Sequence, residues 1–202
     1  MLKVLILLSV TFFNCAGSKK NISNLNYEEK NEDLASPFIS CSGKGNIRAT
    51  GNMDGSLSFS FKSQNDSTFF QFSDPLGRKV LLMWISSDQI TGRNLIENKQ
   101  YDYDEIESLF PLLKVLKPND VTSFFWGEKP TYNKKDKSIP IKIRKNIKLD
   151  FSGEKNKEQR FTFNIADFYD HSTGQKIRID IKNRKLNTEF INIKKFWKLL
   201  KY

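Results

Sequence analysis

The strongest constraint on the fold is an alternation of apolar and hydroxyl side chains in the first third of the chain. Leu57, Phe59 and Phe61 alternate with serines. A period of two places successive side chains on opposite faces of an extended strand, so one face of this segment is apolar and the other polar. The dipeptide Asp54-Gly55 directly before the segment is typical of a hairpin turn. The sequence therefore predicts a half-buried strand that is entered through a tight turn.

Short apolar segments separated by polar turns continue this pattern toward the C-terminus. We expect strands at residues 45–49, 57–61, 68–72, 79–85, 89–93, 139–143, 147–151, 160–165, 176–181 and 186–191. An open antiparallel sheet of about nine to eleven strands seldom stays flat. The expected fold class is therefore mainly β with some α, an antiparallel half-open β-barrel.

One segment, residues 102–127, departs from the strand pattern. Its first half repeats apolar residues at i, i+3, i+4 and i+7, which is the spacing of one helix face: Ile106, Leu109, Phe110 and Leu113. Asp102 and Glu105 have the spacing of a capping box at the start of this helix. Pro111 lies inside the run and should kink or end the helix.

A second short helix is expected after Pro111. Asn119 or Asp120 is a suitable N-cap, and Gly127 is a suitable left-handed stop. Val121, Phe124 and Phe125 form its apolar stripe. We expect this helical pair to cap the concave face of the sheet and leave a half-barrel with an apolar interior.

The N-terminus has the pattern of an export signal. Lys3 precedes an apolar segment that is too short for a transmembrane helix, which needs about 20 apolar residues. Cys15 ends this segment, and a polar stretch follows. We interpret residues 1–14 as a signal peptide, 15–37 as a flexible tether lipidated on Cys15, and 38–202 as the folded domain. A plain cleaved signal and an uncleaved anchor are the alternatives, and both also export the chain.

Charge and cysteine content limit the function classes. The formal net charge of +10 favours anionic surfaces. Export removes most of the case for nucleic acid, so we expect phospholipid rather than nucleic acid as the partner. If Cys15 carries lipid, Cys41 has no disulfide partner and should be a buried or half-buried free thiol.

An enzymatic function has little support in the sequence. His171 is the single histidine, and Asp167 and Asp170 lie near it. Such a group is suited in principle to binding a metal or moving a proton, but the adjacent Ser172-Thr173-Gly174 is typical of a hairpin turn. Gly43 and Gly45 lack the remaining residues of a phosphate loop. We expect no catalytic residue, no metal and no cofactor.

The turn between the expected strands 68–72 and 79–85 carries an unusual residue. Pro75 and Gly77 are typical turn formers, because proline presets φ and glycine permits positive φ. Leu76 between them has no role in forming a turn. It either folds back onto the core or is exposed.

At these positions the chain resembles a known family, the outer-membrane lipoprotein receptor LolB. The sequence Asp74-Pro75-Leu76-Gly77 is similar to the Asn-Pro-Leu-Gly turn of that family. The segment from Phe125 to Pro130, which reads Phe-Trp-Gly-Glu-Lys-Pro, is similar to the family pattern Trp-x-x-Gly-x-Pro. The lipidated N-terminus and the strand pair 45–49 and 57–61 also correspond. The resemblance covers roughly residues 39–130, and the C-terminal third agrees only in its strand count.

The resemblance implies a function and a location. It implies a lipid-anchored receptor in the outer membrane, facing the periplasm, that accepts lipoproteins from a periplasmic LolA-like carrier and inserts them into the membrane. Their acyl chains would occupy an apolar cavity, and the Pro75, Leu76 and Gly77 turn would touch the membrane. We expect a monomer whose partners are the carrier, the acyl chains and the outer membrane.

The inward side chains of strands and helices supply the expected lining of that cavity. Strand register and helix spacing select ten of them: Phe59, Phe61, Phe70, Phe72, Leu81, Met83, Leu109, Phe110, Phe124 and Phe125. The sequence equally permits these residues to pack a dry core. Other functions therefore stay open, namely a related lipid or lipoprotein carrier, a structural or adhesive surface lipoprotein with a solid core, and an exported hydrolase using Asp167, Asp170 and His171.

The basic C-terminal segment, residues 182–202, has no counterpart in the family. Its last part sets Phe196, Trp197, Leu199 and Leu200 between lysines. Two interpretations are open, a last strand that packs against the domain and a short amphipathic segment that rests on anionic lipid. We favour ordinary packing.

Overall fold

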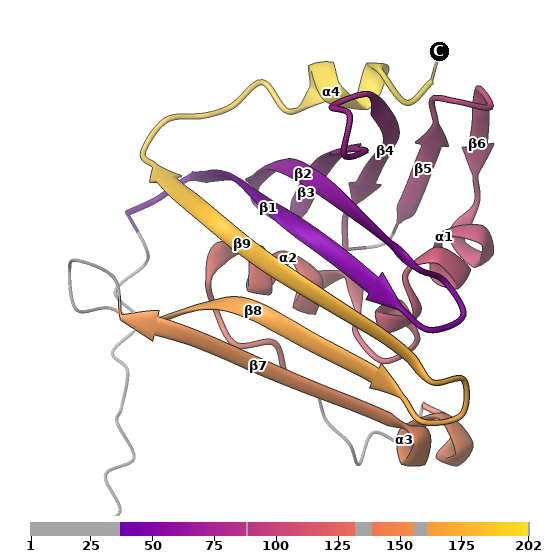
Figure 1. Ribbon diagram of the computed structural model, residues 1–202. Helices are drawn as coiled ribbons and strands as arrows, with labels where there is room; N and C mark the ends of the chain where they lie inside the picture. Colours follow the sequence, from indigo (N-terminus) through magenta and orange to yellow (C-terminus); the bar gives the residue numbers. More distant parts are fainter. Residues whose placement is uncertain (1–36, 88, 132–138, 156–160, 202) are drawn as a thin grey trace, which may run out of the picture. The chain divides into compact units, whose positions relative to one another are not determined.

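Nine antiparallel strands form one sheet in the computed structural model of the protein, which describes residues 37–87, 89–131, 139–155 and 161–201 (Figure 1). The strands are β1 (Ser40–Thr50), β2 (Gly55–Gln64), β3 (Ser67–Ser73), β4 (Lys79–Ile85), β5 (Ile90–Asn94), β6 (Lys99–Tyr101), β7 (Ile147–Lys155), β8 (Phe161–Asp170) and β9 (Gln175–Asn187). Their order is β6-β5-β4-β3-β2-β1-β9-β8-β7. The pairing of β1 with β9 joins an N-terminal meander to a C-terminal one. Because β6 and β7 do not pair with each other, the sheet is open, as predicted.

Three short helical segments follow β6 and cover one face of the sheet. They are α1 (Tyr103–Leu109), the 3-10 helix η1 (Pro111–Lys114) and α2 (Pro118–Trp126). Pro111 ends α1 as predicted, because η1 starts at this proline. Gly127 ends α2 in the left-handed conformation, with φ of 91°. The predicted N-cap of α2 at Asn119 or Asp120 is wrong. The helix begins earlier, at Pro118, because proline suits a first helical turn.

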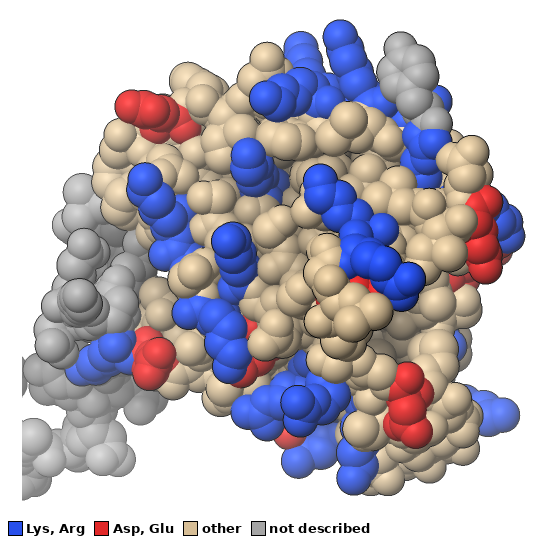
Figure 2. Space-filling model, turned by 45° about the horizontal axis from the view of Figure 1, so that its top comes forward, with Lys and Arg blue, Asp and Glu red and all other residues tan. Residues whose placement is uncertain are grey.

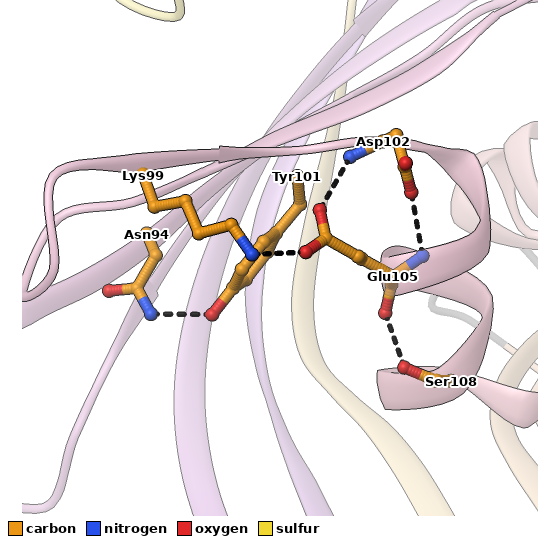
Figure 3. A network of polar contacts seen from close by, with 6 residues as sticks. All are labelled: Asn94, Lys99, Tyr101, Asp102, Glu105 and Ser108. Carbon is orange, nitrogen blue, oxygen red and sulfur yellow. Dashed lines mark hydrogen bonds and ion pairs between the residues drawn. The ribbon is translucent and has the colours of Figure 1, made fainter.

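A polar network fixes the junction between β6 and α1 (Figure 3). The Asp102 carboxylate accepts the Glu105 backbone N–H at 2.9 Å, and the Glu105 carboxylate accepts the Asp102 N–H at 3.1 Å. This is the predicted capping box. Lys99 forms an ion pair with Glu105, and its hydrogen bond and charge lower the pKa of that carboxyl. In the same region Asn94 donates to the Tyr101 hydroxyl at 2.6 Å. The first covering helix is therefore tied to the edge of the sheet.

Two of the predicted strands are wrong. Residues 141–143 are the start of α3 (Ile141–Asn146), and residues 139 and 140 precede this helix instead of forming a strand. Ile139 and Ile143, four positions apart, both pack against the core while Ile141 is 62% exposed, which is helical spacing. The predicted strand 186–191 is not separate, because β9 continues from Gln175 to Asn187 through an irregularity in its pairing with β1. The short strand β6 was not predicted.

The apolar side chains form two clusters on opposite faces of the sheet. The larger one lies between the sheet and the helices α1, η1 and α2, and it includes nine of the ten predicted lining residues. The smaller one contains Phe69, Leu82, Trp84 and Leu200. Phe196 and Trp197 of the C-terminal helix α4 (Lys194–Lys198) pack against this smaller cluster, and Figure 1 shows where α4 lies over the sheet. Ordinary packing of Phe196, Trp197 and Leu200 is thus confirmed.

Within the described ranges, no helix has the length and apolar character needed to cross a bilayer.

Candidate lipid-binding site

The turn between β3 and β4 presents Leu76 to solvent. Its side chain is 79% exposed, so it does not fold back onto the core. The Gly77 N–H donates to the Asp74 carbonyl at 2.9 Å and closes the turn, and Gly77 has a φ of 82°. The backbone therefore uses Pro75 and Gly77 as predicted, and the exposed leucine is held at the tip.

The Asp74 carboxylate organises this turn from within. It accepts the backbone N–H groups of Leu76 at 3.0 Å and Arg78 at 2.9 Å, and the Arg78 guanidinium lies 2.6 Å away. Partial desolvation would raise the pKa of Asp74, but these hydrogen bonds and the charge of Arg78 outweigh it and lower the pKa. An ionised carboxylate thus orders the segment that carries Leu76.

An apolar groove opens beside this turn. Its volume is about 440 Å³, which lies within the range of small-molecule sites. It extends from the β1–β2 hairpin across the sheet to the end of α1. Its lining residues are Ile47, Ala49, Met53, Asp54, Gly55, Ser56, Leu57, Pro75, Leu81, Leu109, Phe110 and Ile177. Because Pro75 is part of the lining, the exposed Leu76 stands next to the groove rim.

The interior of the half-barrel, in contrast, is filled. Between the sheet and the helices lie two apolar cavities of about 30 and 20 Å³, each with room for about one or two waters. Aromatic rings occupy most of the remaining space. Phe125 packs edge to face on Phe59, Phe61 and Phe70, with ring centroids 4.6 to 5.7 Å apart. In this conformation the predicted inner face is a packed core.

The predicted lining residues therefore divide between core and groove. Phe59, Phe61, Phe70, Phe72, Met83, Phe124 and Phe125 are buried in the core. Leu81 and Phe110 are buried at the base of the groove. Leu109 is 37% exposed and lines the groove, so it lies at the rim and does not face the core rings.

Two glycines in β1 make room for these rings. Gly43 pairs with Phe61 and Gly45 with Phe59 across the ladder. A Cβ atom at Gly45 would lie 2.5 Å from Cζ of Phe59 and 2.4 Å from the Asp180 carbonyl oxygen. The two glycines thus serve packing, which agrees with the rejection of a phosphate loop.

Arg184 holds the C-terminal end of α2 against the sheet. Its guanidinium donates to the carbonyls of Phe125 at 2.8 Å, Phe124 at 3.2 Å and Phe163 at 2.8 Å. Positive charge at this end is favourable, because the last carbonyls of a helix lack partners within the helix. Cys41 lies nearby as a buried free thiol, as predicted, and burial raises its pKa to about 12. This α2 end is therefore anchored in the core.

A second polar contact anchors α2 to the sheet. Trp126, from the segment that resembles the family motif, donates its indole N–H to Ser63 at 2.8 Å. Ser63 also bonds to Thr68, which lies 3.3 Å from the Thr122 hydroxyl. Ser63, Thr68 and Thr122 are buried and Trp126 is half-buried, and their polar groups satisfy one another.

Asp167, Asp170 and His171 lie at the β8–β9 hairpin, where the sequence predicted a turn. Asp170 accepts the Ser172 N–H at 2.8 Å, and Asp167 pairs with Arg178 at 3.4 Å. The His171 and Tyr169 rings meet edge to face, with centroids 4.3 Å apart. Within the described part of the chain, no three His, Cys, Asp or Glu side chains come close enough to hold a metal ion. The geometry here is that of a sheet hairpin.

Several groove residues were missed in the sequence. Ile47, Ala49 and Leu57 alternate with polar neighbours beside the Asp54-Gly55 turn, and this alternation was a usable signal for an apolar end of the barrel. Met53 and Ile177 also line the groove, but no sequence pattern indicates this, because only the folding of the chain brings them there. Cys15, the signal peptide 1–14 and the tether up to residue 36 lie outside the described residues.

Comparisons with known proteins support the fold. No protein-family model matches the chain, and no curated protein matches it in sequence. Among solved structures, it is similar to a domain from Vibrio parahaemolyticus that its description assigns to outer membrane lipoprotein sorting. The TM-score is 0.51 at 7% identity, and the match covers 81% of this chain and 92% of that domain. The chain thus shares the open antiparallel sheet and short helices of a lipoprotein-sorting domain.

Proposed function

We propose that this protein is a lipid-anchored receptor that takes lipoproteins from a periplasmic carrier and inserts them into the outer membrane. The observation that carries the proposal is the pairing of the exposed Leu76 with the apolar groove beside it. Leu76 would enter the bilayer, and the groove would hold acyl chain at the membrane surface. The shared fold of a lipoprotein-sorting domain is consistent with this role.

Energetics require a sheltered route for the cargo. Three acyl chains contain about forty-five methylenes, and each exposed methylene costs about 0.8 kcal/mol. Transfer through water would thus cost some tens of kcal/mol, so acyl chains have to move between apolar linings. The groove beside Leu76 is the apolar lining that an acyl chain would meet first when it reaches this protein.

Full sheltering requires the interior to admit lipid as well. Phe110 lines both the groove and the adjacent cavity of about 30 Å³. An acyl chain that displaces Phe110 and η1 from the sheet would replace one set of apolar contacts with another, which limits the cost. We therefore place cargo entry at the junction of α1 and η1.

Delivery to vesicles tests the role of Leu76. Protein loaded with a fluorescent triacylated peptide is mixed with vesicles of phosphatidylethanolamine and phosphatidylglycerol. Burial of one leucine contributes about 1.5–3 kcal/mol, so Leu76→Glu should slow delivery about tenfold or more while peptide binding is retained. Ile96→Glu is the matched control, because Ile96 is also an apolar turn residue and is 70% exposed. Equal delivery by the two variants would contradict the proposal.

A structural or adhesive surface lipoprotein is the second candidate. The filled interior favours it, because cavities of about 30 and 20 Å³ hold no acyl chain without movement of the helices. The two functions differ in one property, which is acyl-chain binding. A protein that fails to bind the triacylated peptide at all would support this second function.

A further inference from the structure

The C-terminal segment crosses the face of the sheet opposite the helices that bound the groove. After β9 the chain turns back, and Ser40 donates its hydroxyl to the Glu189 carbonyl at 2.7 Å. The Ile191 N–H then donates to Gln64 at 2.6 Å, and Arg93 of β5 reaches the Leu199 carbonyl at 3.4 Å. Backbone contacts thus hold the segment across β1, β2 and β5.

One side of this segment is occupied by the sheet. The apolar residues of this side have the i, i+3, i+4, i+7 spacing: Ile193, Phe196, Trp197 and Leu200. They belong to or pack on the smaller apolar cluster, named the outer cluster from here on, which contains Phe69, Leu82, Trp84 and Leu200. The Phe196 ring stacks on Phe69 at 5.0 Å, and Trp197 meets Trp84 at 5.2 Å. The apolar stripe of α4 is therefore already partnered, and the segment is rigidly placed.

The other side of the segment carries exposed lysines, Asn192 and two exposed apolar residues, and the exposed Glu189 precedes them. The lysines are Lys194, Lys195, Lys198 and Lys201, all exposed. None of them pairs with a carboxylate of the described residues. Leu199 is 51% and Phe190 73% exposed, and residues 190–202 contain no Asp or Glu. Figure 2, with the top of the Figure 1 view turned forward, shows more Lys and Arg than Asp and Glu on this side.

We propose that this lysine face of α4, with Leu199 and Phe190, is a docking surface for an anionic phospholipid bilayer. Lysine stems reach along a surface and place their charges among headgroup phosphates. Isolated apolar side chains between such lysines suit the boundary between headgroups and acyl chains. Exposed apolar side chains among the lysines favour a bilayer over an extended acidic peptide, because a bilayer offers both phosphates and acyl chains.

A bilayer contact through α4 is separate from the cargo transfer of the proposed function. The face belongs to the C-terminal segment, whereas Leu76 belongs to the β3–β4 turn, so either surface can fail without the other. A bilayer contact through α4 would hold the domain at the membrane by charge and would require no cargo.

Vesicle binding of matched double variants tests the proposal. All proteins are the full chain with Cys15→Ala, so that no acyl anchor contributes, and contributions from the remaining N-terminal residues cancel in the comparison. Lys194→Gln with Lys198→Gln removes two charges that make no ring contact. The control, Lys142→Gln with Lys145→Gln, removes two exposed charges from α3.

The expected result is a loss of about 25-fold in affinity for phosphatidylglycerol vesicles in the α4 variant, since each lysine contributes about fivefold at an anionic surface. The control should lose much less, the arginine pair Lys194→Arg with Lys198→Arg should retain binding, and phosphatidylcholine vesicles should bind none of the proteins tightly. Equal losses in the α4 and control variants, or unchanged binding in the α4 variant, would overturn the proposal. Binding that is equally tight on phosphatidylcholine would overturn it too.

Discussion

Removal of the Arg184 guanidinium should weaken the whole domain, because this side chain connects three elements. It comes from β9 and donates to the last carbonyls of α2 and to Phe163 of β8. Arg184→Met keeps the apolar length of the side chain but removes all three of these hydrogen bonds. The change isolates the anchoring of α2 from the packing of the core.

The magnitude follows from the hydrogen bonds and the charge. Hydrogen bonds to a charged group contribute about 1.5–3 kcal/mol each. The variant also avoids the desolvation cost of burying a charge, and this offsets several kcal/mol of the loss. We expect a net loss of about 2–4 kcal/mol in the free energy of unfolding. For a chain of this size that is a decrease of about 5–15 °C in Tm.

Thermal unfolding followed by circular dichroism measures this loss. The matched control is Arg178→Met on the same strand, because Arg178 pairs only across 3.4 Å with Asp167 and both side chains are about half exposed. Surface pairs of this kind contribute about 0–1 kcal/mol, so Tm should fall by at most about 4 °C. If the two variants have the same Tm, or if Arg184→Met has the Tm of the parent, the anchoring role assigned to Arg184 is wrong.

Two other predictions concern β1 and the Leu76 turn. Gly45→Ala should lower the free energy of unfolding by about 1–3 kcal/mol through overpacking, because its Cβ would meet Phe59 and Asp180. Gly55→Ala, with no atom within 4 Å of its Cβ, is the control, and equal urea midpoints would refute the packing role. The pKa of Asp74 is lowered from 3.8, so its stabilising contribution is present above that value and is lost as the pH falls through the folded pKa. The stability difference between the parent and Asp74→Asn should therefore exist at neutral pH and vanish in acid, and a difference that persists once the carboxyl is protonated would contradict this assignment.

Local signals in the sequence predicted much of the fold. The alternation around Phe59 and Phe61 fixes their face, because a shift by one residue would turn every phenylalanine to solvent. Asp102 and Glu105 define a helix start by their own hydrogen bonds, and Pro111 ends that helix because it lacks an N–H. These features depend on neighbours in the chain, which the sequence displays.

Features that depend on tertiary packing were not predicted. Ile139 to Ile143 alternate like a strand, but the position of the core selects helical spacing for them. The filled interior depends on how Phe125 meets three other rings, which no periodicity encodes. The outer cluster had a visible signal, since β3 and β4 are apolar on both faces, which is typical of strands covered on both sides.

The most direct test of lipid handling is to map where an acyl chain lies on the protein. A triacylated peptide with a photoreactive diazirine in one acyl chain is bound, illuminated and located by mass spectrometry of the digested protein. The account predicts crosslinks concentrated on groove residues such as Leu57, Leu81 and Phe110, and their loss when excess unlabelled triacylated peptide competes. Crosslinks that are absent, or that fall mainly on the outer faces of β7 and β8, would contradict the assignment of the groove as the acyl-chain site.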